Sequence, residues 1–186
     1  WNNQITSFEG SENLPRGLKE LNLFNNQITS FEGSENLPRG LEKLYLCGNQ
    51  ITSFEGAENL PRGLKKLHLW DNQINSFEGS ENLPRGLKEL YLEGNKISSF
   101  EGSENLPREI KKIVIDFNPI YIYHPEIINS KINILEHIKT LQCKKDFQDC
   151  LNEIKCNPRL DYCKENLKEE SKMFQEDSEL LLNLIK

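Results

Sequence analysis

The sequence has no long hydrophobic run and no excess of positive charge. It lacks any run of about 18 apolar residues, the length that a membrane-spanning helix needs, so we expect no membrane segment. Lys and Arg number 23 against 29 Asp and Glu, which gives a formal net charge of −6. This balance argues against a general phosphate or nucleic-acid binder. With 36% hydrophobic residues, the chain fits one soluble domain, alone or with an appendage.

The usual parts of catalytic and cofactor sites are missing as well. There is no Ser/His/Asp triad, Gly-rich phosphate loop or paired acid site, so we expect no enzyme, no catalytic residue and no cofactor. His68 has neither a second metal ligand nor a nucleophile nearby in the pattern, so we expect no metal site there. The sequence also shows no secretory signal, so we expect a cytoplasmic, intracellular protein. Trp1 has the repeat phase of Trp70, and we therefore expect the chain to begin inside a repeat, with an N-terminal part missing.

The sequence contains a 23-residue repeat in several copies. Full copies start at Leu18, Leu41, Leu64 and Leu87, a partial copy precedes them and an altered copy follows from Ile110. The period and the pattern L-x-x-L-x-L-x-x-N-x-I resemble those of leucine-rich repeat solenoids. One coil is too small to bury its own apolar face, so equivalent residues must stack into ladders. The predicted ladders are Phe8, Phe31, Phe54, Phe77, Phe100 and Leu14, Leu37, Leu60, Leu83, Leu106.

The repeats are most similar to the SDS22-like subtype, which has N-x-I-x-x-I-E-G-L-E-x-L-x-x-L where this chain has its Asn49 to Leu64 stretch. Two departures are the period, about 22 residues in that subtype, and Ser34, Ala57, Ser80 and Ser103 in place of its Leu. Near-identical repeats before an Ile/Asn/Lys-rich tail also resemble repeat proteins of giant DNA viruses and their amoebal hosts. The resemblance to the SDS22-like repeats covers residues 1–128. It implies a horseshoe of five to six coils that binds proteins through short parallel strands on its concave face.

An Asn recurs where each coil leaves its strand. Its amide can satisfy backbone groups of adjacent coils, and an orphaned buried backbone group costs ~1–3 kcal/mol. The series is Asn3, Asn26, Asn49, Asn72, Asn95 and Asn118.

The copies differ most in and just after the strand, at positions that face away from the core. Aromatic residues exposed on a rigid sheet and rimmed by charge are typical of protein interfaces. Relaxed selection on a surface that binds nothing remains an alternative. The predicted partner-binding residues are Lys43, Tyr45, Lys66, His68, Trp70, Asp71, Glu89, Tyr91 and Glu93.

The repeat pattern ends after Asn118, and a helical period begins near Ser130. Ser130 can cap a helix with the apolar stripe Ile134, Ile138 and Leu141, which Asn157-Pro158 ends. We expect residues 129–186 to form a helical C-terminal cap, because the last strand would otherwise leave an open edge. A helical partner site or an oligomerisation surface is the competing interpretation.

Four cysteines lie in this tail, spaced x6, x5 and x6. Zinc sites usually begin with ligands two to four residues apart. Three of the four cysteines, Cys143, Cys150 and Cys163, fall on apolar stripes, which favours reduced core thiols. Disulfides and a four-thiolate zinc site remain open alternatives. The cysteines are Cys143, Cys150, Cys156 and Cys163, and a fifth thiol, Cys47, is expected on the concave face.

The sequence thus predicts an α/β-type solenoid with a helical cap, acting as a monomeric scaffold for a protein partner, with no nucleic acid or membrane as partner. The alternatives are the substrate-recognition part of an adaptor whose recruiting module is missing, and a purely structural repeat protein.

Overall fold

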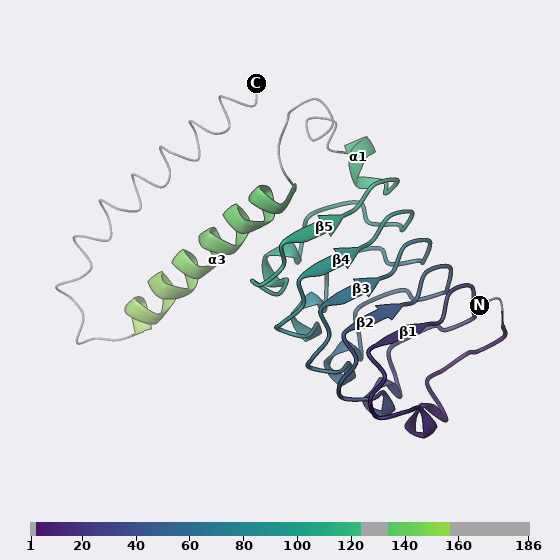
Figure 1. Ribbon diagram of the computed structural model, residues 1–186. Coiled ribbons are helices and arrows are strands. Elements are labelled where there is room, and N and C mark those ends of the chain that lie inside the picture. Colours follow the sequence, from purple (N-terminus) through teal and green to yellow (C-terminus); the bar gives the residue numbers. More distant parts are fainter. Residues whose placement is uncertain (1–2, 124–133, 157–186) are drawn as a thin grey trace.

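The computed structural model describes residues 3–123 and 134–156 (Figure 1). Five short strands form one parallel sheet in the order β1-β2-β3-β4-β5. Each residue of a strand pairs with the residue 23 positions further on, as Leu21 does with Leu44, so the register repeats the period of the sequence. The strands are β1 (Glu20–Asn22), β2 (Lys43–Tyr45), β3 (Lys66–His68), β4 (Glu89–Tyr91) and β5 (Lys112–Val114).

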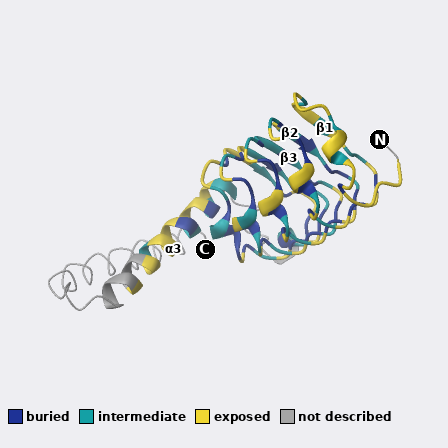
Figure 2. Ribbon diagram, turned by 90° about the horizontal axis from the view of Figure 1, so that it is seen from below, coloured by how far each residue is buried: buried dark blue, intermediate teal, exposed yellow. Residues whose placement is uncertain are grey.

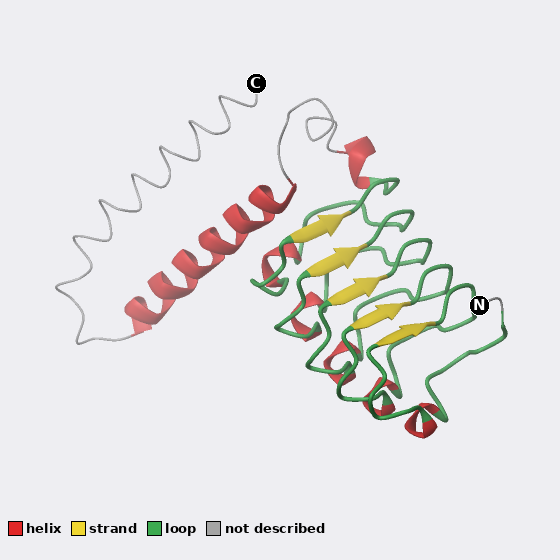
Figure 3. Ribbon diagram, viewed as in Figure 1, coloured by secondary structure: helices red, strands yellow, loops and turns green. Residues whose placement is uncertain are grey.

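A 3₁₀ helix precedes each strand, on the side of the solenoid opposite the sheet (Figure 3). A short connection of about eleven residues joins each strand to the following 3₁₀ helix. We call the unit that contains strand βn coil n. The 3₁₀ helices are Ser11–Asn13, Ser34–Asn36, Ala57–Asn59, Ser80–Asn82 and Ser103–Asn105.

The core consists of ladders of equivalent side chains, as predicted. The five Phe are buried, with exposed fractions between 0% for Phe31 and 8% for Phe100. In the Leu ladder, Leu37 to Leu106 are buried and Leu14, in the first coil, is partly buried. Figure 2 shows buried residues along the interior of the coils and exposed residues on their outer turns.

The Asn ladder ties each coil to the one before it. Asn49 donates from Nδ2 to the carbonyls of Leu46 (2.9 Å) and Leu23 (3.0 Å), and its Oδ1 accepts the backbone N–H of Ile28 (3.0 Å). The same pattern recurs at Asn72. The role predicted for these amides is confirmed for Asn26 to Asn118, all of which are buried; Asn3 is exposed.

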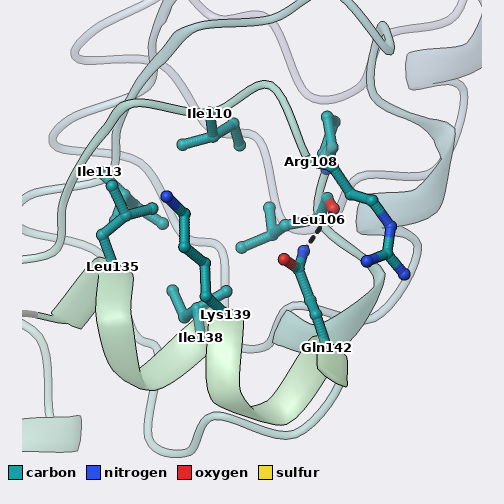
Figure 4. Close-up of a pocket in the computed structure, with 9 residues that line it drawn as sticks. Leu106, Arg108, Ile110, Ile113, Leu135, Ile138, Lys139 and Gln142 are labelled. Atoms are coloured by element: carbon teal, nitrogen blue, oxygen red, sulfur yellow. Dashed lines mark hydrogen bonds between the residues drawn. The ribbon is translucent and has the colours of Figure 1, made fainter. Parts of the chain in front are cut away.

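Within the described residues, two helices follow the last coil: α1 (Ile120–Tyr123) and α3 (Ile134–Cys156). The apolar stripe predicted for α3 packs against coil 5, with Ile138 2% exposed and Leu141 partly buried. Gln142 is also buried there, because its Nε2 donates to the carbonyl of Leu106 at 2.8 Å (Figure 4). The described part of α3 extends to Cys156; Asn157-Pro158, its expected end, and Ser130, its expected cap, lie outside the described residues and stay predictions.

Ion pairing and hydrogen bonding hold the middle of α3 to the last 3₁₀ helix and the turn after it. Asp146 pairs with Arg108, and Lys145 donates to Asn105. The helical C-terminal cap is therefore present over residues 134–156. The expected boundary between 128 and 129 lies outside the described residues and stays a prediction.

One cysteine prediction is wrong for α3. Cys143 was expected on the apolar stripe, yet it is exposed and free. The reason is that α3 contacts the solenoid on the side of Ile138 and Gln142, and Cys143 lies beside that contact rather than in it. The side chains of Cys150 and Cys156, and all of Cys163, are outside the described structure.

Candidate functional site

The strands position the predicted residues on the solvent side of the sheet. In β2, Leu44 is buried in the core while Lys43 and Tyr45 on either side are half-buried, because successive side chains of a strand point to opposite faces. The same alternation holds in β3 and β4. We call this surface the sheet face: the outward side chains of the five strands, together with the second and third residues after each strand.

An aromatic stack crosses the middle of the sheet face. The ring of His68 lies between those of Tyr45 and Tyr91, with centroid distances of 4.5 Å and 4.1 Å and interplanar angles of 25° and 7°. The Lys112 Nζ lies 4.9 Å from the centroid of the Tyr91 ring. The stack forms because the register aligns these residues on neighbouring strands, which lie ~4.8 Å apart, close to a stacking distance.

Burial sets the electrostatics of this stack. It lowers the pKa of His68 below its ordinary value, against the opposing effect of the Glu89 carboxylate. The lowered pKa favours the neutral imidazole. Burial, followed by the negative charge of Glu20, raises the pKa of Tyr45.

The first residues of the five strands form a charged row, and four of these five residues form two ion pairs. Lys43 pairs with Glu20 at 3.1 Å, and Lys66 pairs with Glu89 at 2.7 Å. The Tyr91 hydroxyl also donates to Glu89, at 2.8 Å. The bond from Lys66, and then that from Tyr91, lower the pKa of Glu89. Pairs as exposed as these contribute ~0–1 kcal/mol each, so their main effect is to fix the charged side chains in place.

A second row, two residues after each strand, contains an aromatic pair. The rings of Phe24 and Trp70 are 5.2 Å apart although one coil, coil 2, lies between theirs in the sequence. Cys47 lies between them in the row and is only 1% exposed, so the expectation of a thiol on the surface was wrong. The large rings meet across the small side chain of the coil between them, and burial raises the pKa of Cys47 to about 12.

The third row has a left-handed backbone in every coil, with φ between 51° and 66°. A Cβ added to Gly48 would lie 2.1 Å from Asn25 Oδ1, and one added to Gly94 would lie 2.3 Å from Asp71 Oδ1. Asn25 and Asp71 thus occupy the space over the glycine of the next coil. Part of the sequence divergence that suggested a partner is therefore explained by contacts within the sheet face itself.

An acidic group lies at the end of the sheet face where coils 3 to 5 meet. Glu93 is half-buried, and burial, then the nearby Asp116 and Asp71, raise its pKa. Its Oε2 is shielded from water and has no hydrogen-bond partner in the described structure. Asp116 Oδ1 accepts the Tyr121 hydroxyl at 3.0 Å.

Phe117 lies beside this group and is 87% exposed. Asp116 and Phe117 were visible in the sequence as members of the divergent rows, but they were not selected as site residues. The signal that could have found Phe117 is the left-handed position, where its equivalents are Asn, Asp or Gly and an aromatic residue is out of place.

The structure thus brings eight of the nine predicted residues into two adjoining groups, the stack with its ion pairs and the acidic end. Trp70, the ninth, lies next to both groups, and the Phe24 ring covers part of its ring. Within residues 3–123 and 134–156, no group of three or more His, Cys, Asp or Glu is arranged to hold a metal ion. None of the helices in these two segments is long and apolar enough to cross a membrane. The arrangement suits noncovalent recognition.

A family model for leucine-rich repeats, built on two copies, matches residues 1–39, 39–85 and 62–108. The chain is a leucine-rich repeat protein. The matched residues contain β1 to β4 and the candidate residues of these coils. Proteins of this family are typically binding scaffolds without enzymatic activity.

Among curated proteins, no sequence matches this leucine-rich repeat protein. Solved structures do resemble it. An internalin (inlF) from Listeria monocytogenes is 29% identical, with a TM-score of 0.52, over 62% of this chain and 33% of the internalin chain. A chain of the Drosophila melanogaster SNF/U2A′ complex is 22% identical, with a TM-score of 0.52, over 72% of this chain and 87% of its own length, and shows the fold alone. The chain thus spans about a third of the internalin's length.

Proposed function

We propose that this leucine-rich repeat protein is a non-catalytic scaffold that binds a protein partner through its sheet face, the concave face of the expected horseshoe. The observation that carries the proposal is the aromatic stack of Tyr45, His68 and Tyr91, which stays half-exposed on the solvent side of the sheet. Nothing in the core requires aromatic residues there, since the inward position of each strand is filled by Leu44 and its equivalents.

The rigidity of the stack also supports binding. Each ring is held by its neighbours, and the hydroxyl of Tyr91 is fixed by Glu89 at 2.8 Å. A partner would gain contact area with aromatic side chains that have already lost most of their rotamer freedom, so the entropic cost of association is low. Interfaces enrich Tyr and Trp at their energetic centres for this reason.

We also propose an SDS22-like repeat subtype, a monomeric state, an intracellular location, and neither nucleic acid nor membrane as partner. The mixed charges of the sheet face support the exclusion of nucleic acid, because two of its lysines, Lys43 and Lys66, are already paired with carboxylates. Two cysteines of the described structure, Cys47 and Cys143, are free, as is usual in a reducing compartment. An adaptor with a separate recruiting part would use the same face.

The experiment that tests the proposal is affinity capture from a lysate of the source cells, followed by mass spectrometry. Trp70→Ala combined with Tyr91→Ala should abolish capture of a specific protein while the circular dichroism spectrum is unchanged. The matched control is Glu55→Gln with Glu78→Gln, two exposed residues outside the sheet face. The proposal fails if the aromatic double variant retrieves the same proteins as the parent.

A further inference from the structure

We propose that the acidic end of the sheet face, around Asp71, Glu93, Asp116 and Phe117, docks a basic segment of a protein partner. Its Arg or Lys side chains would lie against the three carboxylates and beside the Phe117 ring. This inference rests on the proposed function, because it names the partner chemistry for part of the same face.

The negative charge at this end is only partly compensated, by the nearby charge of Lys112. The lysines of β2 and β3 are engaged in ion pairs with Glu20 and Glu89, and that of β5 lies over the Tyr91 ring. Among the residues that the structure describes, no ion pair joins Asp71, Glu93 or Asp116 to a cation. The negative charge here is available to a partner, unlike that of the paired carboxylates.

The surroundings of Glu93 indicate which kind of group would bind there. Its Oε2 is shielded from water without any hydrogen bond, and its pKa is raised by burial and by the neighbouring Asp116 and Asp71. A carboxylate in this state is stabilised by a nearby positive charge, which the exposed Asp71 and Asp116 beside it can bind directly. The three carboxylates are not grouped as metal ligands within the described chain. An ammonium or guanidinium group is therefore the complementary cation.

Phe117 supplies the apolar half of the surface. It is 87% exposed, so its ring packs on almost nothing among the described residues. Its backbone is left-handed, with φ 59°, which is unfavourable for an aromatic residue and natural for Gly or Asn. The ring therefore contributes nothing visible to the fold. A guanidinium plane can stack on such a ring while it pairs with a carboxylate.

Asp116 is oriented for the same task. The Tyr121 hydroxyl donates to its Oδ1 at 3.0 Å, which fixes the carboxylate next to the exposed ring. The side chain remains exposed, so a partner can reach it. Anionic ligands, nucleic acid included, would be repelled by the three carboxylates.

The test measures binding of a fluorescein-labelled peptide in which three arginines alternate with glycines, at low ionic strength, to the whole chain. Its control peptide has citrulline at each arginine, which removes the charge and keeps the shape. We expect the arginine peptide to bind at least ~5-fold more tightly than the citrulline peptide, as one or two partly desolvated charge pairs would give. Equal binding of the two peptides would refute the inference.

Three variants place the binding on the surface. Asp71→Asn with Asp116→Asn should weaken arginine-peptide binding by at least ~5-fold, whereas the matched pair Glu55→Gln with Glu78→Gln, with the same change in net charge, should weaken it by less than ~2-fold. Phe117→Gly should also weaken binding, and because Gly fits a left-handed backbone the variant should fold at least as well as the parent.

The outcomes separate this inference from the proposed function. If both charge pairs weaken binding equally, the attraction is nonspecific and the inference is wrong. If the aromatic double variant loses its captured protein while Asp71→Asn with Asp116→Asn leaves arginine-peptide binding unchanged, the proposed function stands and only the basic partner is rejected. A dimer that this acidic pair disrupts would assign the surface to a second copy of the chain instead.

Discussion

Asn72→Ala tests whether the buried amide ladder stabilises the solenoid. The side chain makes three short bonds: Nδ2 donates to the carbonyls of Leu46 (2.9 Å) and Leu69 (3.0 Å), and Oδ1 accepts the N–H of Ile51 (3.0 Å). The two carbonyls keep a second donor, because Asn49 also reaches Leu46 and Asn95 also reaches Leu69. Only the Ile51 N–H loses its sole partner.

The expected cost follows from this difference. One orphaned buried N–H costs ~1–3 kcal/mol, and each second bond lost from a carbonyl that stays paired costs ~0.5–1 kcal/mol. The free energy of unfolding should therefore fall by ~2–5 kcal/mol, a large part of the ~5–15 kcal/mol typical of a domain.

Urea unfolding followed by circular dichroism measures this loss. The matched control is Asn3→Ala, at the same repeat position but exposed, which should change the free energy of unfolding by less than ~0.5 kcal/mol. A loss below ~1 kcal/mol for Asn72→Ala, or equal losses for the two variants, would refute the ladder as a source of stability.

Three further predictions concern the sheet face. Gly94→Ala should lower the free energy of unfolding by ~1–3 kcal/mol through backbone strain and the contact with Asp71, and adding Asp71→Gly should restore part of it in urea titrations. Because the pKa of Glu93 is raised, the folded chain binds protons more tightly there than the unfolded chain, so stability should fall as pH rises through the two pKa values; Glu93→Gln should flatten this dependence in melts from pH 4 to 8. Cys47 should react slowly with iodoacetamide in peptide mapping, and Trp70→Ala should accelerate the reaction, whereas an unchanged rate would show that the ring does not shield the thiol.

The repeat allowed much of the fold to be predicted from the sequence. A fixed period of 23 residues places every copy of a position in one row, so Phe31 and Phe54 had to stack once the chain formed coils. The same reasoning identified the role of Asn49, because a recurring amide at the end of a strand has few physical uses other than backbone hydrogen bonds. The location of the candidate residues on the solvent side of the sheet followed from strand alternation.

Contacts that depend on the orientation of outward side chains could not be predicted. Cys47 is buried because Phe24 and Trp70 meet across it, which depends on ring orientations and not on the repeat pattern. The alternation of side chains and glycines in the left-handed row is another contact of this kind, visible only when Asp71 is seen over Gly94.

The contact between α3 and coil 5 was also only half predictable. The helical period identified Ile138, but it could not indicate that a polar residue, Gln142, would be buried on the same side through a bond to a backbone carbonyl. Nor could it show that the contact would exclude Cys143, since periodicity gives a stripe and not the extent of the surface that covers it.

The contact between α3 and the last coil has a consequence for how the number of repeats can change. The helix is held by Asn105, the Leu106 carbonyl and Arg108, and the Asn-Leu-Pro-Arg phrase that provides them occurs in every coil. A gain or loss of internal units would therefore present nearly the same docking surface to the terminal helix. The number of repeats can therefore change during evolution while α3 still covers the last coil.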